Sequence, residues 1–112
     1  MLVERRIMHL NQLVDECHKY AKQQGFWDAS TNIGEKLMLI VTELAEAMEV
    51  VRHKDVRDPR EQAALCAFAE ELADTVIRVG DLSGWLGIDL GEAVLKKMAA
   101  NRNRPFMHGK RV

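Results

Sequence analysis

Apolar residues recur at intervals of three and four along most of this chain, and no segment convincingly alternates apolar and polar residues over the length of a strand. An interval of three or four matches the turn of an α-helix, whereas a half-buried strand requires an interval of two. The chain has 112 residues, which is room for about four helices around a single core. The sequence therefore predicts an all-α fold in a single domain, residues 1–112.

Glycine and proline set the expected limits of the helices. Gly25 is a natural terminator of the first helix, Pro59 closes the polar loop after the second, and Gly84 and Gly87 bracket a turn after the third. The first expected helix covers about residues 3–24, and the second follows a cap at residue 30, 31 or 32 and ends near residue 53. The third covers about residues 60–82, and the fourth begins at residue 89 or 91 and ends near residue 101.

The third expected helix is apolar around much of its circumference. Cys66, Ala73 and Ile77 lie toward the back of its main apolar stripe, so we expect this helix to be central, in the interface of an oligomer. A chain this small also gains buried apolar surface when it oligomerises. Cys17 and Cys66 are too few for a disulfide framework, and we expect both to be reduced core residues.

Charge and hydropathy limit the classes of partner that the protein is expected to bind. The formal net charge of -1 argues against a general nucleic-acid binder, for which a strongly basic domain is expected. No apolar run reaches the roughly 18 residues that a membrane helix needs, and charged residues begin as early as Glu4. We therefore expect a cytoplasmic protein with neither nucleic acid nor membrane as a partner.

Two acidic motifs stand on the second and third expected helices, Glu43-Leu-Ala-Glu46 and Glu71-Leu-Ala-Asp74. Residues three apart on a helix lie about one turn apart on one face, so each motif directs two carboxylates to one place. Such a motif by itself usually marks a solvated helix face. Carboxylate oxygens are also the ligands that Mg²⁺ prefers, and Mn²⁺ can replace Mg²⁺ at such sites.

Both motifs have the same orientation relative to the apolar stripe of their helix. The stripes consist of Leu37, Ile40, Leu44, Met48 and Val51 in one helix, and Leu65, Phe68, Leu72, Val76 and Val79 in the other. Both acidic pairs lie to one side of these stripes, in the same rotational sense. If the two edges face each other, four carboxylates converge, and protonation or a bound cation must relieve their repulsion.

The paired motifs resemble those of the all-α nucleoside triphosphate pyrophosphohydrolases, the MazG-like superfamily that includes dimeric dUTPases and dCTP pyrophosphatases. The resemblance covers nearly the whole chain, and the motif spacing is closest to the dCTP pyrophosphatase branch. It implies a four-helix MazG-like bundle, assembled as a homodimer or as a homotetramer that is a dimer of dimers. It also implies Mg²⁺-dependent hydrolysis of (deoxy)nucleoside triphosphates to a monophosphate and pyrophosphate, in house-cleaning of nucleotide pools.

The resemblance also implies roles for individual residues. The metal ligands would be Glu43, Glu46, Glu71 and Asp74, with Glu43 also activating the attacking water. The phosphate-binding residues would be Lys97, Asn101 and Arg104. His18 and Trp27 would form the base and sugar pocket, although Trp27 could equally cap the core and His18 could be an exposed helix residue.

Three positions depart from the family pattern. His53 and Arg78 stand where the dCTP pyrophosphatase branch has a tryptophan and a tyrosine, and Thr42 stands where many members of the superfamily add a glutamate. Arg78 follows Asp74 by four residues, which allows either an ion pair within the helix or a contact with phosphate. The preferred nucleotide and the residue that activates water therefore stay open.

Two other classes of protein also present acidic helices. A ferritin-like di-iron bundle converges carboxylates but needs Glu-x-x-His pairs, and the chain contains none. A noncatalytic helical module, which binds nucleotide or another protein, would leave its acidic residues in solvent. Dependence of turnover on a metal ion distinguishes the pyrophosphohydrolase from the noncatalytic module.

Overall fold

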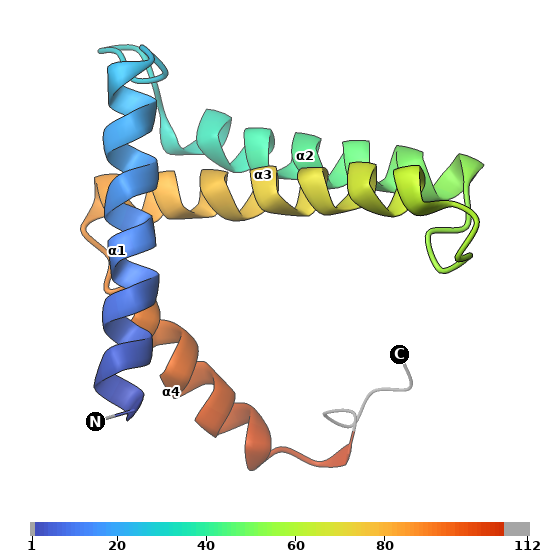
Figure 1. Ribbon diagram of the computed structural model, residues 1–112. Coiled ribbons are helices and arrows are strands. Elements are labelled where there is room, and N and C mark those ends of the chain that lie inside the picture. The colour runs from blue at the N-terminus through green and yellow to red at the C-terminus, as the bar shows by residue number, and fades with distance from the viewer. Residues whose placement is uncertain (1, 107–112) are drawn as a thin grey trace.

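The computed structural model of the protein describes residues 2–106, which form four helices and no strand (Figure 1). The helices are α1 (Leu2–Gln23), α2 (Ile33–His53), α3 (Gln62–Leu86) and α4 (Leu90–Arg102). The prediction of an all-α fold is confirmed. No helix in the described part of the chain combines the length and the apolar character needed to cross a membrane.

Local side-chain contacts explain where the helices begin. Asn32 caps α2 by accepting a hydrogen bond from the backbone N–H of Glu35 at 2.9 Å, and Asp89 caps α4 through the N–H of Glu92 at 3.0 Å. Such caps satisfy N–H groups that have no partner in the first turn of a helix. Gly87, with φ of 66°, provides the left-handed residue that ends α3.

α3 extends farther than the sequence predicted. The sequence predicts an end near Leu82, with Gly84 at the start of a turn, but the helix continues through Gly84 to Leu86. Gly84 instead marks the place where α1 approaches α3: a Cβ atom there would lie 2.6 Å from the Cβ of His18. The glycine is required for close helix packing rather than for a turn.

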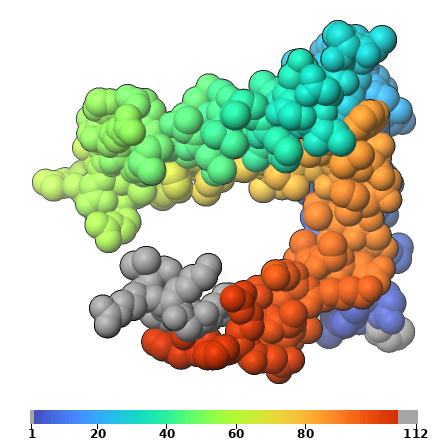
Figure 2. All heavy atoms as spheres, turned by 180° about the vertical axis from the view of Figure 1, so that it is seen from behind, coloured from blue at the N-terminus to red at the C-terminus, as the bar shows by residue number. Residues whose placement is uncertain are grey.

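The four helices form an open arrangement rather than a closed bundle. α2 and α3 lie side by side and antiparallel, α1 crosses this pair at the C-terminal end of α3, and α4 packs on α1 (Figure 1). Figure 2 shows the open space between the α2–α3 pair and α4. The radius of gyration of 16.7 Å exceeds the value of about 13 Å for a compact domain of this size. Four helices are present as predicted, but within one chain they do not close into a bundle, and the MazG-like bundle assembled from several copies stays a prediction.

The docking of α4 on α1 explains why the bundle does not close. A Cβ atom at Gly91 would lie 2.7 Å from the Cα of Ile7, so the two helix backbones touch there. The Asn11 side chain also donates to Asp89 at 2.8 Å and accepts from the N–H of Gly91 at 3.0 Å. These contacts fix the start of α4 against α1, and its direction leads away from α2.

The buried core is small. It contains Val14, Cys17 and Ala21 of α1 together with Ala47, Ala64 and Leu82. The apolar stripes of α2 and α3 are largely exposed in the single chain, with Leu44 at 48% and Leu72 at 42%. Cys66, expected in the core, is also exposed, while Cys17 is buried and both thiols are free. The two helices thus contact each other through polar and small residues and leave much of their apolar surface uncovered.

Candidate functional site

Three of the predicted carboxylates meet between α2 and α3. Glu43 and Glu46 of α2 and Glu71 of α3 bring carboxylate oxygens within 4.8 Å of one another. Their meeting follows from the i, i+3 spacing of the first motif and the antiparallel pairing of the two helices. Three carboxylate oxygens at this separation could hold one divalent cation. We call these three residues the carboxylate cluster.

Asp74, the fourth predicted ligand, is not part of the carboxylate cluster. It lies about one turn farther along α3 than Glu71, on the wall of the neighbouring cleft. The structure therefore brings together three of the four carboxylates that the resemblance assigned to the metal.

The charges of the carboxylate cluster are only partly compensated. Oε2 of Glu71 is buried and has no hydrogen-bond partner among residues 2–106. The pKa of Glu71 is raised to about 7, chiefly because a proton on it can be shared with Glu46, and further by burial and by repulsion from Glu46 and Glu43. A bound cation would offset the same repulsion and give the buried oxygen a partner.

Arg78 contacts Glu43 across the two helices. Its Nε donates a hydrogen bond to Oε1 of Glu43 at 2.8 Å, and this contact is the main reason that the pKa of Glu43 is lowered. The ion pair with Asp74 that the i, i+4 spacing permits is not the one that forms. Arg78 thus neutralises one end of the carboxylate cluster from the third helix.

These contacts belong to a continuous row of polar pairs along α2 and α3, which we call the polar seam. The pairs are Lys36 with Asp81, Glu43 with Arg78, and Glu46 with Glu71. Their order is reversed between the helices because the helices are antiparallel. The seam explains why the apolar stripes lie on another side of the pair: the acidic edges, not the stripes, face each other.

A cleft of about 390 Å³ adjoins the carboxylate cluster. Glu43, Asp74 and Arg78 line one part of it, and Asp81 lies about one turn beyond Arg78 on α3. Its remaining lining is Cys17, Tyr20, Ala21, Phe26 and Ile77. The cleft therefore combines charged groups from the polar seam with aromatic and apolar walls, the composition expected of a small-molecule site.

Asp81 is a buried carboxylate that the sequence reasoning did not select. Its Oδ1 accepts hydrogen bonds from Nδ1 of His18 at 2.8 Å and from Nε1 of Trp27 at 2.7 Å. Nζ of Lys36 lies 3.6 Å from Oδ2. A signal was present in the sequence: Asp81 follows Asp74 by seven residues and Lys36 precedes Glu43 by seven, so each lies two turns along the same helix face.

Trp27 and His18, the expected base and sugar pocket, surround Asp81 instead of lining the cleft. The Trp27 ring stacks on Trp85 with centroids 4.7 Å apart, and Nζ of Lys36 lies 4.0 Å from its centroid. His18 meets the Trp27 ring edge-on at 5.5 Å. Nζ of Lys36 also donates to the backbone oxygen of Phe26 at 2.9 Å, which ties the 24–32 loop to α2.

The predicted phosphate-binding residues are remote from the carboxylate cluster in the single chain. Lys97 and Asn101 lie on α4 and Arg104 follows it, and α4 packs on α1 across the open space from α2 and α3 (Figure 2). None of the three lines the cleft. Oδ1 of Asn101 is buried and has no hydrogen-bond partner among residues 2–106.

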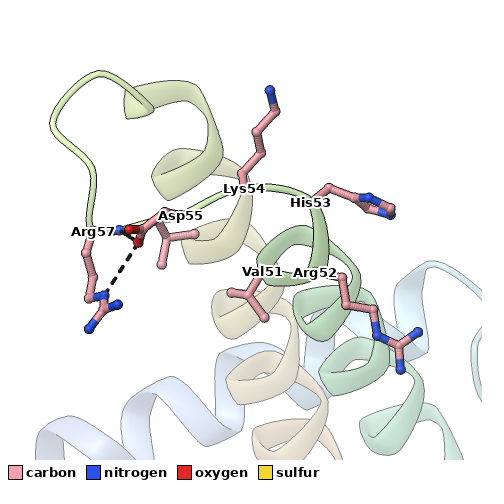
Figure 3. A pocket seen from close by; sticks show the side chains of 7 residues that line it. Val51, Arg52, His53, Lys54, Asp55 and Arg57 are labelled. Atoms are coloured by element: carbon pink, nitrogen blue, oxygen red, sulfur yellow. Dashed lines mark hydrogen bonds and ion pairs between the residues drawn. The ribbon is translucent and has the colours of Figure 1, made fainter.

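His53, one of the departures from the family pattern, stands at the far end of α2. Its Nε2 lies 2.8 Å from Oε1 of Glu49. A shallow hollow of about 490 Å³ follows the chain here from Val51 to Arg57, and its side chains point in several directions (Figure 3). The Arg57 guanidinium turns back to Asp55, at 3.4 Å. These groups do not converge on one point, so we assign no ligand to this hollow.

Searches against protein-family models, curated proteins and solved structures found no match to this chain.

Proposed function

We propose that this protein is a Mg²⁺-dependent pyrophosphohydrolase of (deoxy)nucleoside triphosphates, which releases a nucleoside monophosphate and pyrophosphate in nucleotide house-cleaning. The observation that carries the proposal is the carboxylate cluster, with its buried, unpartnered Glu71 oxygen, beside a cleft lined by aromatic and charged groups. The resemblance of the two acidic motifs to the MazG-like superfamily supplies the reaction type.

The residues fit a metal-assisted attack on a phosphate. Glu43, Glu46 and Glu71 would hold Mg²⁺, which supplies charge neutralisation at phosphate oxygens, and Asp74 would face the same ion from the cleft wall. The Arg78 contact lowers the pKa of Glu43, which makes its carboxylate a weaker base but keeps it ionised, so it can orient the attacking water and accept its proton. Glu43 therefore combines both roles in the proposal.

A second copy of the chain would complete the site. The exposed surface of the chain is 8655 Å², against about 6,200 Å² for a typical folded monomer of this mass. This excess for one chain exceeds the roughly 800 Å² that each partner buries in a standard interface. In the proposed homodimer the apolar stripes of α2 and α3 pack on their equivalents, and the α4 of one copy brings Lys97, Asn101 and Arg104 to the cluster of the other.

The test is release of pyrophosphate from a panel of canonical and modified nucleoside triphosphates, with Mg²⁺, with Mn²⁺ and with chelator. We expect turnover only with metal, and a roughly 100-fold loss in Glu46→Gln, the size of effect seen when a group that stabilises transition-state charge is removed. Glu49→Gln is the matched control, because Glu49 lies on the same helix but pairs with Arg52 and His53 at the surface.

Two outcomes would contradict the proposal. Turnover that persists with chelator or in Glu46→Gln would remove the carboxylate cluster from the reaction. Nucleotide binding without hydrolysis of any member of the panel would favour the noncatalytic helical module.

A further inference from the structure

Asp81 has an acceptor oxygen to spare. The carboxylate belongs to a residue that is only 6% exposed, and its two hydrogen bonds, from His18 and Trp27, both go to Oδ1. Oδ2 accepts no hydrogen bond among residues 2–106, because Nζ of Lys36 stands 3.6 Å away. Oδ2 therefore faces the Lys36 ammonium without a hydrogen bond and keeps acceptor capacity for a ligand or for water.

The cleft extends from the carboxylate cluster to Asp81. Asp81 lines the cleft, and it lies on α3 seven residues, or about 10 Å, beyond Asp74 on the same helix face. A nucleotide with its phosphates at Glu43 and Asp74 would extend its base along the cleft toward Asp81. Tyr20 and Phe26, both more than half exposed, offer aromatic faces beside this path.

We infer that Asp81 recognises a nucleobase that carries an exocyclic amino group, accepting the amino N–H on Oδ2, while His18, Trp27 and Lys36 hold the carboxylate in place. A carboxylate only accepts hydrogen bonds, so it favours the amino groups of cytosine, adenine and guanine. It disfavours uracil and thymine, which present carbonyl oxygens at the corresponding edge. This inference rests on the proposed function, and it names the base class of the substrate.

His18 and Trp27 act on the ligand through Asp81. The Trp27 ring cannot serve as the stacking platform, because Trp85 stacks on it and the Lys36 ammonium lies over its centroid. Their N–H groups hold Oδ1 and leave Oδ2, which faces the Lys36 ammonium at 3.6 Å, without a hydrogen bond. They are positioning residues, and Asp81 is the residue that touches the base.

The test is equilibrium binding of nucleoside monophosphates by calorimetry, which does not depend on hydrolysis. The wild-type protein is expected to bind dCMP about 10- to 100-fold more tightly than dUMP, the ratio expected from one hydrogen bond to a charged group. In Asp81→Asn this ratio should fall toward 1, because the amide can donate to the uracil carbonyl as well as accept. A merely structural role for Asp81 would weaken both nucleotides equally.

Two tryptophan variants distinguish the role of Trp27 in positioning Asp81 from a role in folding. Trp27→Phe removes the N–H that reaches Asp81 but keeps the ring, and it should lower the dCMP:dUMP ratio several-fold. Trp85→Phe removes an indole that stacks on Trp27 and gives Asp81 no hydrogen bond, so it should leave the ratio unchanged. Circular dichroism and thermal melting establish that each variant is folded.

Dideoxycytidine monophosphate identifies the other donor that could reach Asp81, the sugar hydroxyl. If wild-type binding is equal for dCMP and dUMP but lost for the dideoxy analogue, Asp81 takes the sugar and the inference is overturned. Equal binding of all three also overturns it, whatever the outcome of the pyrophosphate assay. Tighter binding of dCMP than of dUMP without hydrolysis of any nucleotide would instead support base recognition by Asp81 and contradict the proposed function.

Discussion

At the scale of single residues, one proton on Glu71 and the guanidinium of Arg78 reduce the repulsion among the carboxylates of the cluster. Glu71 retains its proton near neutral pH, with its pKa at about 7, while Arg78 lowers the pKa of Glu43. The pKa values of these two glutamates shift in opposite directions although both lie in the cluster, because only Glu43 contacts the Arg78 guanidinium. A divalent metal ion that binds here must displace the Glu71 proton, so its affinity should increase as the pH rises to about 7.

Glu71 also predicts how the metal-free protein responds to pH. Below the ordinary pKa of 4.5 the group is protonated in both the folded and the unfolded chain, and between 4.5 and about 7 only the folded chain keeps the proton. Its contribution to stability is therefore present below about pH 4.5 and is lost as the pH rises to about 7. Glu71→Gln, which stays neutral, should melt at a higher temperature than the wild type at pH 8 with chelator, and about equally at pH 4.5.

The same melting experiment includes the metal. Added Mg²⁺ should raise the melting temperature of the wild type at pH 8, since a ligand that binds only the folded chain stabilises it, and should raise that of Glu71→Gln much less. Glu70→Gln, an exposed neighbour on α3, is the matched control. If wild type and Glu71→Gln share one pH profile, Glu71 does not carry the raised pKa.

At the scale of helices, the decisive contact is the approach of α1 to α3 at Gly84. An alanine normally stabilises a helix interior by about 1 kcal/mol relative to glycine. At Gly84 the added Cβ would meet the Cβ of His18 at 2.6 Å and the backbone oxygen of Val14 at 3.3 Å. The backbone of α1 cannot yield at both places without moving away from α3.

We therefore expect Gly84→Ala to lower the free energy of unfolding by about 1–3 kcal/mol, the usual cost of overpacking. Urea denaturation measures the change, with Ala99→Gly on the exposed part of α4 as a control for helix propensity alone, at about 1 kcal/mol. A stabilised Gly84→Ala variant would mean that α1 and α3 are not in contact there.

At the scale of the whole molecule, the exposed apolar stripes of α2 and α3 predict self-association. Leu44 lies in the middle of the α2 stripe and is 48% exposed, whereas Met38 is 62% exposed but lies on the neighbouring face with Thr42 and Glu49. Charge on the stripe should oppose burial against a second copy, while charge at Met38 should not.

Light scattering after size exclusion tests this prediction. The wild type should elute as a dimer or a dimer of dimers, Leu44→Glu as a monomer of lower melting temperature, and Met38→Glu as the wild type. A wild-type protein that is monomeric at micromolar concentration would contradict the proposed homodimer. No second copy would then bring Lys97, Asn101 and Arg104 to the carboxylate cluster.

Local patterns in the sequence are enough to predict the helices and the pairing of carboxylates within a turn. Periodicity, caps and terminators act over three or four residues, so the four helices and the shared face of Glu43 and Glu46 can be read from spacing. The seven-residue spacing of Lys36 from Glu43 and of Asp81 from Asp74 could have added Lys36 and Asp81 to the predicted site. The limits of α3 could not be read this way, because the reason for Gly84 is a neighbour distant in the sequence.

Which helix faces meet depends on the packing of the helices in three dimensions. The amphipathic pattern favoured burial of the apolar stripes, but within one chain α2 and α3 meet along the polar seam, where ion pairs and small residues allow close approach. That choice pairs Arg78 with Glu43, places Asp74 beside the carboxylate cluster instead of in it, and joins His18 and Trp27 to Asp81. The contacts of a helix face depend on the docking of whole helices, and spacing along the chain carries no information about that docking.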